Sequence, residues 1–182
     1  MGTWRVVKQQ AVRGAPLAEV AFVDIVAGSR TALEGTASWC LSGITSNDRY
    51  LTAIEQRQLR ERQSPPGLAT ALCAALIPIR KDAAWWALAT EERRRIFEES
   101  SHHVRIGTRY LLAIARRLHH CRDLASNEPF DFLTWFEYAS GDAAAFEDLV
   151  GELRATEEWQ FVERECDVRL VSDPANGSIL KP

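Results

Sequence analysis

The sequence predicts an α+β fold in which helices pack on an antiparallel sheet. Three observations predict it. Segments rich in β-branched and aromatic residues alternate with helix-like segments, the helix-like segments carry apolar stripes, and apolar residues are plentiful enough for a core. The chain has 182 residues, of which 46% are hydrophobic and six are tryptophan. This composition excludes a disordered chain, and the length suits one domain or two small fused halves.

The first third of the chain contains three short strand candidates, at residues 4–12, 17–27 and 39–45. Residues 51–63 are polar and rich in Arg, Gln and Glu, which is typical of a surface helix or a loop. The sequence Ser-Pro-Pro-Gly at 64–67 then breaks regular structure. We therefore expect a seam there, after a shortened N-terminal ferredoxin-like half over residues 1–67.

The second part has stronger signals. Residues 69–80 form an apolar run whose proline, Pro78, favours a strand at a sheet edge or near its end. A helix is expected to begin at Thr90 as its N-cap, and a second helix to end at about Leu118. Residues 130–138 are aromatic and strand-like, residues 142–155 have helical periodicity, and residues 159–171 alternate imperfectly as in a strand. This β-α-β-α-β order predicts a ferredoxin-like half over residues 68–172, followed by a tail at 173–182.

All four histidines lie within 19 residues, at positions 102, 103, 119 and 120. Histidine is a common metal ligand and titrates near neutral pH, so this stretch is the first candidate for chemistry. His103 heads an apolar stripe at helical spacing, which continues through Ile106, Gly107, Tyr110, Ile114 and Leu118. A histidine on such a stripe is often a hydrogen-bonded core residue, so the pattern alone leaves both interpretations open.

Charge and cysteine usage exclude several classes of protein. The formal net charge of −3 gives no basic field, so nucleic acid is not an expected partner. The four cysteines include no C-x-x-C pair, which argues against a zinc ribbon, a thioredoxin-like site and covalently attached haem. The sequence has no apolar leader and no run of 18 apolar residues. We therefore expect a cytoplasmic protein with reduced cysteines and no membrane partner.

Two short motifs suggest other metal sites. The E-x-x-H string from Glu99 to His102 occurs in di-iron bundles, but such sites need a second copy on four long helices. The sequence His119-His120-Cys121 could bind zinc, but it lacks a matching pair of ligands. Histidines at the end of a helix, where they favour the dipole, are the simpler interpretation of the second motif.

A series of motifs in a fixed order resembles a known family. The motifs are Ile-Pro-Ile-Arg-Lys-Asp-Ala-Ala-Trp-Trp at 77–86, Glu-Glu-Arg at 91–93, a histidine thirteen residues before an arginine, Asp-Phe-Leu-Thr-Trp-Phe-Glu at 131–137 and Thr-Glu-Glu-Trp at 156–159. Together they resemble the chlorite dismutase family over about residues 44–171. The resemblance implies the dimeric α+β barrel superfamily, and the short chain resembles the branch that forms homodimers.

The resemblance also implies a cofactor and a reaction. The family binds haem b without covalent attachment, here in the C-terminal half, and converts chlorite to chloride and dioxygen with formation of an O–O bond. Matched position by position, His103 is the iron ligand, Arg116 is the cation that guides chlorite and retains hypochlorite, and Glu157 is the carboxylate that hydrogen-bonds the imidazole. The other matches to the surroundings of the haem are Lys81, Trp85 and Tyr50.

Some alternatives stay open at this point. Three extra residues precede the histidine relative to longer relatives, so His102 could be the ligand, although the thirteen-residue spacing to Arg116 favours His103. On one straight helix these two side chains would point roughly 140° apart and lie about 19 Å apart along the axis. The helix must therefore be broken, with Gly107 as a weak point, or Arg116 must come from an adjacent segment. A coproheme decarboxylase or peroxidase-like enzyme and a non-catalytic haem-binding protein are the alternative functions.

Overall fold

The computed structural model describes residues 4–28, 37–46, 57, 66–67, 70–124 and 127–172. Within these residues, seven strands pair antiparallel in one sheet, in the spatial order β2-β1-β7-β4-β6-β5-β3. The strands are β1 (Trp4–Arg13), β2 (Phe22–Val23), β3 (Ile44–Thr45), β4 (Cys73–Lys81), β5 (Ile114–His120), β6 (Phe132–Tyr138) and β7 (Val162–Ser172).

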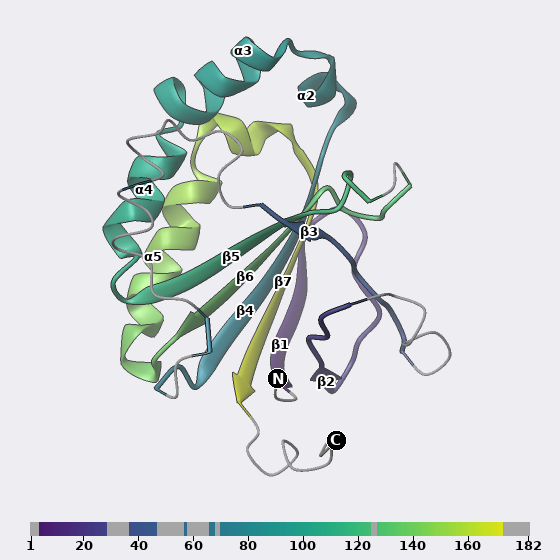
Figure 1. Cartoon of the computed structure of the whole chain (residues 1–182), viewed down its shortest axis with the longest axis vertical. Helices are drawn as coiled ribbons and strands as arrows, with labels where there is room; N and C mark the ends of the chain where they lie inside the picture. Colours follow the sequence, from purple (N-terminus) through teal and green to yellow (C-terminus); the bar gives the residue numbers. More distant parts are fainter. Residues whose placement is uncertain are drawn as a thin grey trace.

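The helices follow β4 and β6 in the chain. They are α2 (Ala83–Ala87), α3 (Thr90–Arg94), a π-helix (Arg95–Ser100), α4 (His103–Tyr110), a 3₁₀-helix (Ser140–Asp142), α5 (Ala143–Arg154) and a second 3₁₀-helix (Glu157–Phe161). Helices α4 and α5 lie on one side of the sheet, and the segment around β2 lies on the other (Figure 1). The α+β class and the ferredoxin-like arrangement predicted from the sequence are confirmed, with the order β-α-β-β-α-β.

Strand β5 is absent from the predicted β-α-β-α-β order, and it shows that the predicted end of the second helix was wrong. The helix expected to reach Leu118 ends at Tyr110, and residues 114–120 pair with β6 instead. The prediction was wrong because Ile114 and Leu118, four residues apart, satisfy the periods of both a helix and a strand. Partners on β6, which are distant in the sequence, decide between the two. Helix α3 has Ala89 rather than Thr90 as its N-cap, and the Glu92 carboxylate accepts a hydrogen bond from the Ala89 amide (2.9 Å).

The N-terminal strands join both ends of this sheet. The strand predicted at residues 4–12 is confirmed as β1, which pairs with β7. Strands β2 and β3 keep only two residues each of the longer strands predicted at 17–27 and 39–45. The polar segment at 51–63, apart from residue 57, and the tail at 173–182 lie outside the described residues. The seam proposed near residue 67 stays a prediction. No helix among the described residues is both long and apolar enough to cross a lipid bilayer.

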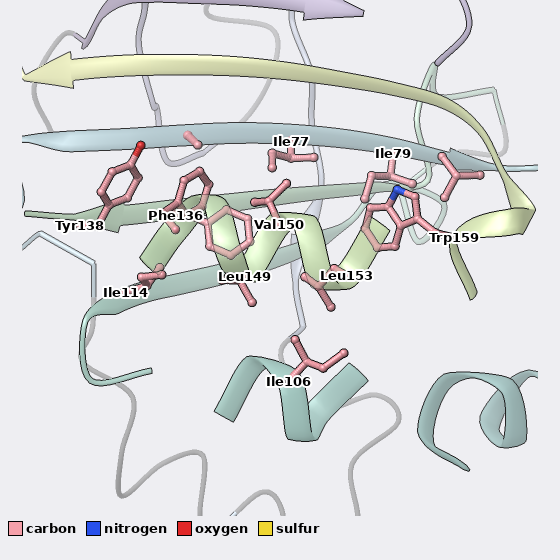
Figure 2. Packing of buried hydrophobic residues seen from close by; sticks show 13 residues of the cluster. Ile77, Ile79, Ile106, Ile114, Phe136, Tyr138, Leu149, Val150, Leu153 and Trp159 are labelled. Atoms are coloured by element: carbon pink, nitrogen blue, oxygen red, sulfur yellow. The ribbon is translucent and has the colours of Figure 1, made fainter. Parts of the chain in front are cut away.

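Successive side chains of the strands pack alternately into two hydrophobic cores, one on each face of the sheet. On β6, Phe136 and Tyr138 pack with the helices, whereas Leu133 and Trp135 belong to the opposite face. Figure 2 shows side chains of α5 lying between the sheet and Ile106 of α4. The buried residues of α5 are Phe146, Leu149, Val150 and Leu153, which share one helical face.

Strand β7 buries charged residues beneath α5. Glu165, Asp167 and Arg169 are each at most 7% exposed, while the alternate residues of the strand pack in the opposite core. Arg154 of α5 donates to Glu165 Oε1 (2.7 Å) and Asp167 Oδ2 (3.0 Å). Arg169 binds both Asp167 and the exposed Glu147. Every buried charge in this group therefore has an opposite charge beside it, as burial requires.

Candidate cofactor pocket

A largely apolar pocket lies between the sheet and the two helices α4 and α5. It holds about 1280 Å³ of space not filled by protein atoms, part of it open to solvent. Its floor consists of alternate residues of three neighbouring strands, with Ile77, Ile79 and Lys81 from β4, Ile114, Arg116, Leu118 and His120 from β5, and Phe132, Thr134 and Phe136 from β6. The two-residue period places all of them on one face of the sheet. Residues of α4 and α5 form the opposite wall.

His103 is the first residue of α4 and lines this pocket. Its Nδ1 lies 2.8 Å from Glu158 Oε2, and the Phe97 ring stacks on the imidazole with the centroids 4.3 Å apart. An ionised carboxylate can only accept a hydrogen bond, so Nδ1 carries the proton and donates it. In the neutral ring Nε2 is then the nitrogen with a lone pair, and a metal ion binds that form of the imidazole.

Glu158 is buried and also binds the ammonium group of Lys81. Lys81 Nζ donates to Glu158 Oε1 and to the Glu158 carbonyl oxygen, each at 2.9 Å, and only 3% of the Lys81 side chain is exposed. Burial alone would raise the pKa of Glu158. The charges of His103 and Lys81, together with their hydrogen bonds, outweigh burial and lower this pKa to about 2. The carboxylate is therefore an anionic acceptor across the neutral pH range.

Local structure places Lys81 and Trp85 at one end of the pocket. Lys81 ends β4, and the Asp82 carboxylate accepts a hydrogen bond from the Trp85 amide (2.8 Å), which begins α2 immediately after the strand. The ammonium group of Lys81 lies 4.7 Å from the centroid of the Trp85 ring. The Trp85 side chain lines the pocket, and its buried Nε1 has no hydrogen-bond partner among the residues that the structure describes.

Arg116 faces the same pocket from β5. The expectation that the helix breaks, or that the arginine lies on an adjacent segment, is correct, because residues 111–113 form a turn between α4 and β5. His103 and Arg116 thus reach one cavity from a helix and from a strand. The other residues of β5 that line the pocket are Ile114, Leu118 and His120.

The structure distinguishes His103 from His102. His102 does not line the pocket, and its Nδ1 donates to the Glu98 carbonyl oxygen (3.1 Å). The side chains of the possible zinc motif, His119-His120-Cys121, also lie in separate places. His119 Nδ1 is paired with Thr45 Oγ1 (3.1 Å), whereas Cys121 is buried in the core on the face opposite the pocket. His120 packs edge-on against Phe132. These neighbouring residues therefore point to different environments.

One predicted site residue is wrong and one lies outside the description. Glu157 is exposed, and the adjacent Glu158 makes the hydrogen bond that was predicted for it. Both belong to a 3₁₀-helix, in which neighbouring side chains point about 120° apart, so only one can face His103. The sequence Thr-Glu-Glu-Trp contains no signal that distinguishes the two. Tyr50 is not among the described residues. Sequence reasoning also missed Phe97, whose ring stacks on the nearby His103, and Ser101, whose hydroxyl oxygen accepts a hydrogen bond from the distant Glu158 amide.

The known proteins that this chain resembles belong to one family. The family model for chlorite dismutase matches residues 26–171. A curated chlorite dismutase from Ideonella dechloratans is 28% identical over 147 residues, which cover 80% of this chain and 49% of the relative. The chain thus spans about half the length of that relative.

Solved structures include relatives of both similar and greater length. The dimeric chlorite dismutase from Nitrobacter winogradskyi is 48% identical, with a TM-score of 0.84 and 95% of each chain covered. The chlorite dismutase from Candidatus Nitrospira defluvii in complex with imidazole is 26% identical, with a TM-score of 0.57, and the match covers 71% of this chain and 53% of that one. From the extent of the family match, this chain belongs to the chlorite dismutase family.

Proposed function

We propose that this chain binds haem b non-covalently in the pocket and decomposes chlorite to chloride and dioxygen. One observation carries the proposal. His103 presents Nε2 while its Nδ1 is hydrogen-bonded to the buried carboxylate of Glu158, and Arg116 lines the same cavity. A histidine whose second nitrogen is oriented by a carboxylate is the usual arrangement of a metal-binding imidazole.

The residues of the pocket suit a porphyrin. Its lining is mostly apolar, as a large planar macrocycle requires, and two cations, Lys81 and Arg116, are placed within it. The buried Nε1 of Trp85 is a donor that still needs an acceptor among the described residues, and a carboxylate substituent of the porphyrin would supply one. In this proposal His103 holds the iron, while Lys81, Trp85 and the predicted Tyr50 belong to the surroundings of the haem.

The roles of the side chains follow from their charges. Bound haem supplies an iron centre that can exchange an oxygen atom with chlorite. Glu158 keeps the proton of His103 on Nδ1 and makes Nε2 a stronger donor to iron. The guanidinium group of Arg116 attracts the chlorite anion and retains hypochlorite inside the pocket until dioxygen has formed. Apolar neighbours such as Leu118 and Phe136 exclude water, which strengthens both electrostatic effects.

We also propose that the protein is a homodimer, because the dimeric Nitrobacter winogradskyi relative covers 95% of the chain at 48% identity. Sedimentation equilibrium should give twice the mass of the 20.5 kDa chain. The predicted cytoplasmic location stays a prediction.

The test combines haem titration with measurement of dioxygen. Haem added to the wild-type protein should give a Soret band of one equivalent per chain, and chlorite should then release dioxygen at an oxygen electrode. His103→Ala should lose stable haem binding, whereas His102→Ala should still bind haem. Haem binding without dioxygen release would contradict the chlorite reaction. Release of carbon dioxide from coproheme and peroxide would instead identify the decarboxylase.

A further inference from the structure

His102 has an unusual backbone conformation. Its φ of 50° and ψ of 36° lie in the left-handed region, and no other non-glycine residue in the described ranges has a positive φ. Histidine, asparagine and aspartate enter this region more readily than most residues, but glycine alone enters it without strain. The position follows a π-helix, whose last turn closes with a hydrogen bond from the Ser101 amide to the Ile96 carbonyl oxygen (2.9 Å).

The left-handed residue separates two helical segments. The His102 carbonyl oxygen accepts the hydrogen bond from the Ile106 amide (2.9 Å), so α4 begins immediately after it. The His102 side chain turns back and donates to the carbonyl oxygen of Glu98, inside the π-helix (3.1 Å). The backbone thus changes direction at one residue, and the side chain of that residue ties the two segments together.

The residues on both sides of His102 bind the same glutamate. Ser101 Oγ accepts a hydrogen bond from the Glu158 amide (2.9 Å), and His103 Nδ1 donates to Glu158 Oε2 (2.8 Å). In a continuous helix, side chains two residues apart point about 200° away from each other, so they could not both face Glu158. The left-handed turn at His102 removes this conflict. Ser101 is 3% exposed and Glu158 is 5% exposed, so the contact is closed to solvent.

We propose that His102 is a positioning residue, whose left-handed conformation lets Ser101 and His103 clamp Glu158 and so fixes the carboxylate against the imidazole of the iron ligand. This inference rests on the proposed haem function for its meaning, but the clamp belongs to the protein alone. It assigns His102 a role through its backbone and not through binding of a ligand by its imidazole.

The test compares variants of His102 that differ in their tolerance of the left-handed region. His102→Gly and His102→Asn adopt it readily, His102→Ala does so with strain, and the β-branched His102→Val does so worst. In the ferrous haem complex, the Fe–His stretching frequency reports how strongly Glu158 polarises His103. It should be retained in the Gly and Asn variants and fall in the Ala and Val variants. The haem dissociation constant of His102→Val should rise roughly tenfold, the factor that corresponds to the strain of one left-handed residue.

A second readout uses the haem-free protein. The Nδ1 proton of His103, protected by Glu158, should give a persistent NMR signal in the wild type, His102→Gly and His102→Asn, and a weakened one in His102→Val. Circular dichroism confirms that each variant is folded. Ser101→Ala, which removes the other half of the clamp, should weaken the same signal without touching His102.

The outcomes separate this inference from the proposed function. The inference is overturned if His102→Gly lowers the Fe–His stretching frequency and the His103 Nδ1 signal as much as His102→Val does. It is also overturned if all four variants give the same values. If the wild type binds no haem, the proposed function fails, and the ranking of the His103 signal in the haem-free variants still supports or overturns the clamp.

Discussion

Two adjacent glutamates with identical chemistry have opposite environments. Glu157 is exposed, while Glu158 is buried between His103 and Lys81. The family resemblance predicts a carboxylate in this segment. The 3₁₀-helix rotates the two neighbouring side chains about 120° apart, and this rotation decides which of them enters the pocket.

Glu158→Gln should destabilise the protein and weaken haem binding. The neutral amide leaves the Lys81 ammonium buried without an opposite charge, which costs about 3 kcal/mol in the free energy of unfolding. Denaturation in urea, with and without haem, measures the change. Glu157→Gln is the matched control and should stay within about 0.5 kcal/mol of the wild type, as surface substitutions usually do. Equal losses in the two variants would contradict the assignment of Glu158.

Arg116→Ala should keep haem but lose chlorite turnover and release more hypochlorite. The substitution removes a cation from the pocket lining and leaves the contacts of His103 in place. The dioxygen yield and a chlorination trap for hypochlorite report the two effects. Arg117→Ala, on the same strand but not among the pocket residues, is the control. A trap signal that is unchanged in Arg116→Ala would count against the retaining role.

At the scale of elements, the end of β1 depends on a glycine and the middle of α5 does not. Gly14 has a φ of +69°, and a Cβ atom there would lie 2.8 Å from the Glu163 carbonyl oxygen of the neighbouring strand. Gly14→Ala should therefore lower the free energy of unfolding by about 2 kcal/mol. At Gly151, in α5, an added Cβ meets no atom within 4 Å, so Gly151→Ala should raise stability by about 1 kcal/mol. Thermal unfolding of both variants measures these changes in stability. Unfolding temperatures that shift in the same direction by similar amounts would contradict the prediction.

The ion pairs between α5 and β7 predict how stability depends on pH. Burial alone would raise the pKa of Asp167, but hydrogen bonds and charges from Arg169 and Arg154 outweigh it and lower the pKa below its ordinary value. The native state therefore binds fewer protons than the unfolded state in acid. The stabilisation is complete above the ordinary aspartate pKa, near pH 4, and is lost as the pH falls through the lower native value.

Asp167→Asn should consequently be less stable at pH 7, by about 3 kcal/mol, because Arg154 and Arg169 each lose one of their two carboxylate partners. Its stability should also fall less steeply than that of the wild type as the pH drops below about 4. Urea denaturation at several pH values measures both quantities. Parallel pH curves for the two proteins would show that other carboxylates carry the acid sensitivity.

At the scale of the whole molecule, the pocket links haem binding to the stability of the fold. The pocket is lined by residues of helices α4 and α5 and of strands β4, β5 and β6. Because these elements come together only in the folded chain, haem should bind the native state and not the unfolded chain. At a free haem concentration a thousand times the dissociation constant, the wild type should gain about 4 kcal/mol. Thermal unfolding with increasing haem measures this gain. His103→Ala should show little of it, and an equal gain would mean that haem binds elsewhere.

Much of the fold could be predicted from local patterns. Strands β1, β4, β6 and β7 and helix α5 follow from apolar runs and periodicity, and the resemblance placed His103 and Arg116 in one site. Strand β5 could not be predicted in this way, because its hydrogen bonds go to β6 and its own residues also suit a helix. The lengths of β2 and β3, only two residues each, likewise depend on how far their partners extend.

Composition and residue order were enough to predict the fold class, the family resemblance and the residue types at the site. The folded chain was needed to show which glutamate faces His103, at which residue the helix before Arg116 ends, and that His102 has a left-handed backbone conformation. Each of these features depends on contacts between residues far apart in the sequence, such as Ser101 with Glu158. A pattern within a short segment carries no information about such contacts. For the same reason, the polar face of β7 is buried beneath α5 although its alternation alone would suit a solvent-facing strand.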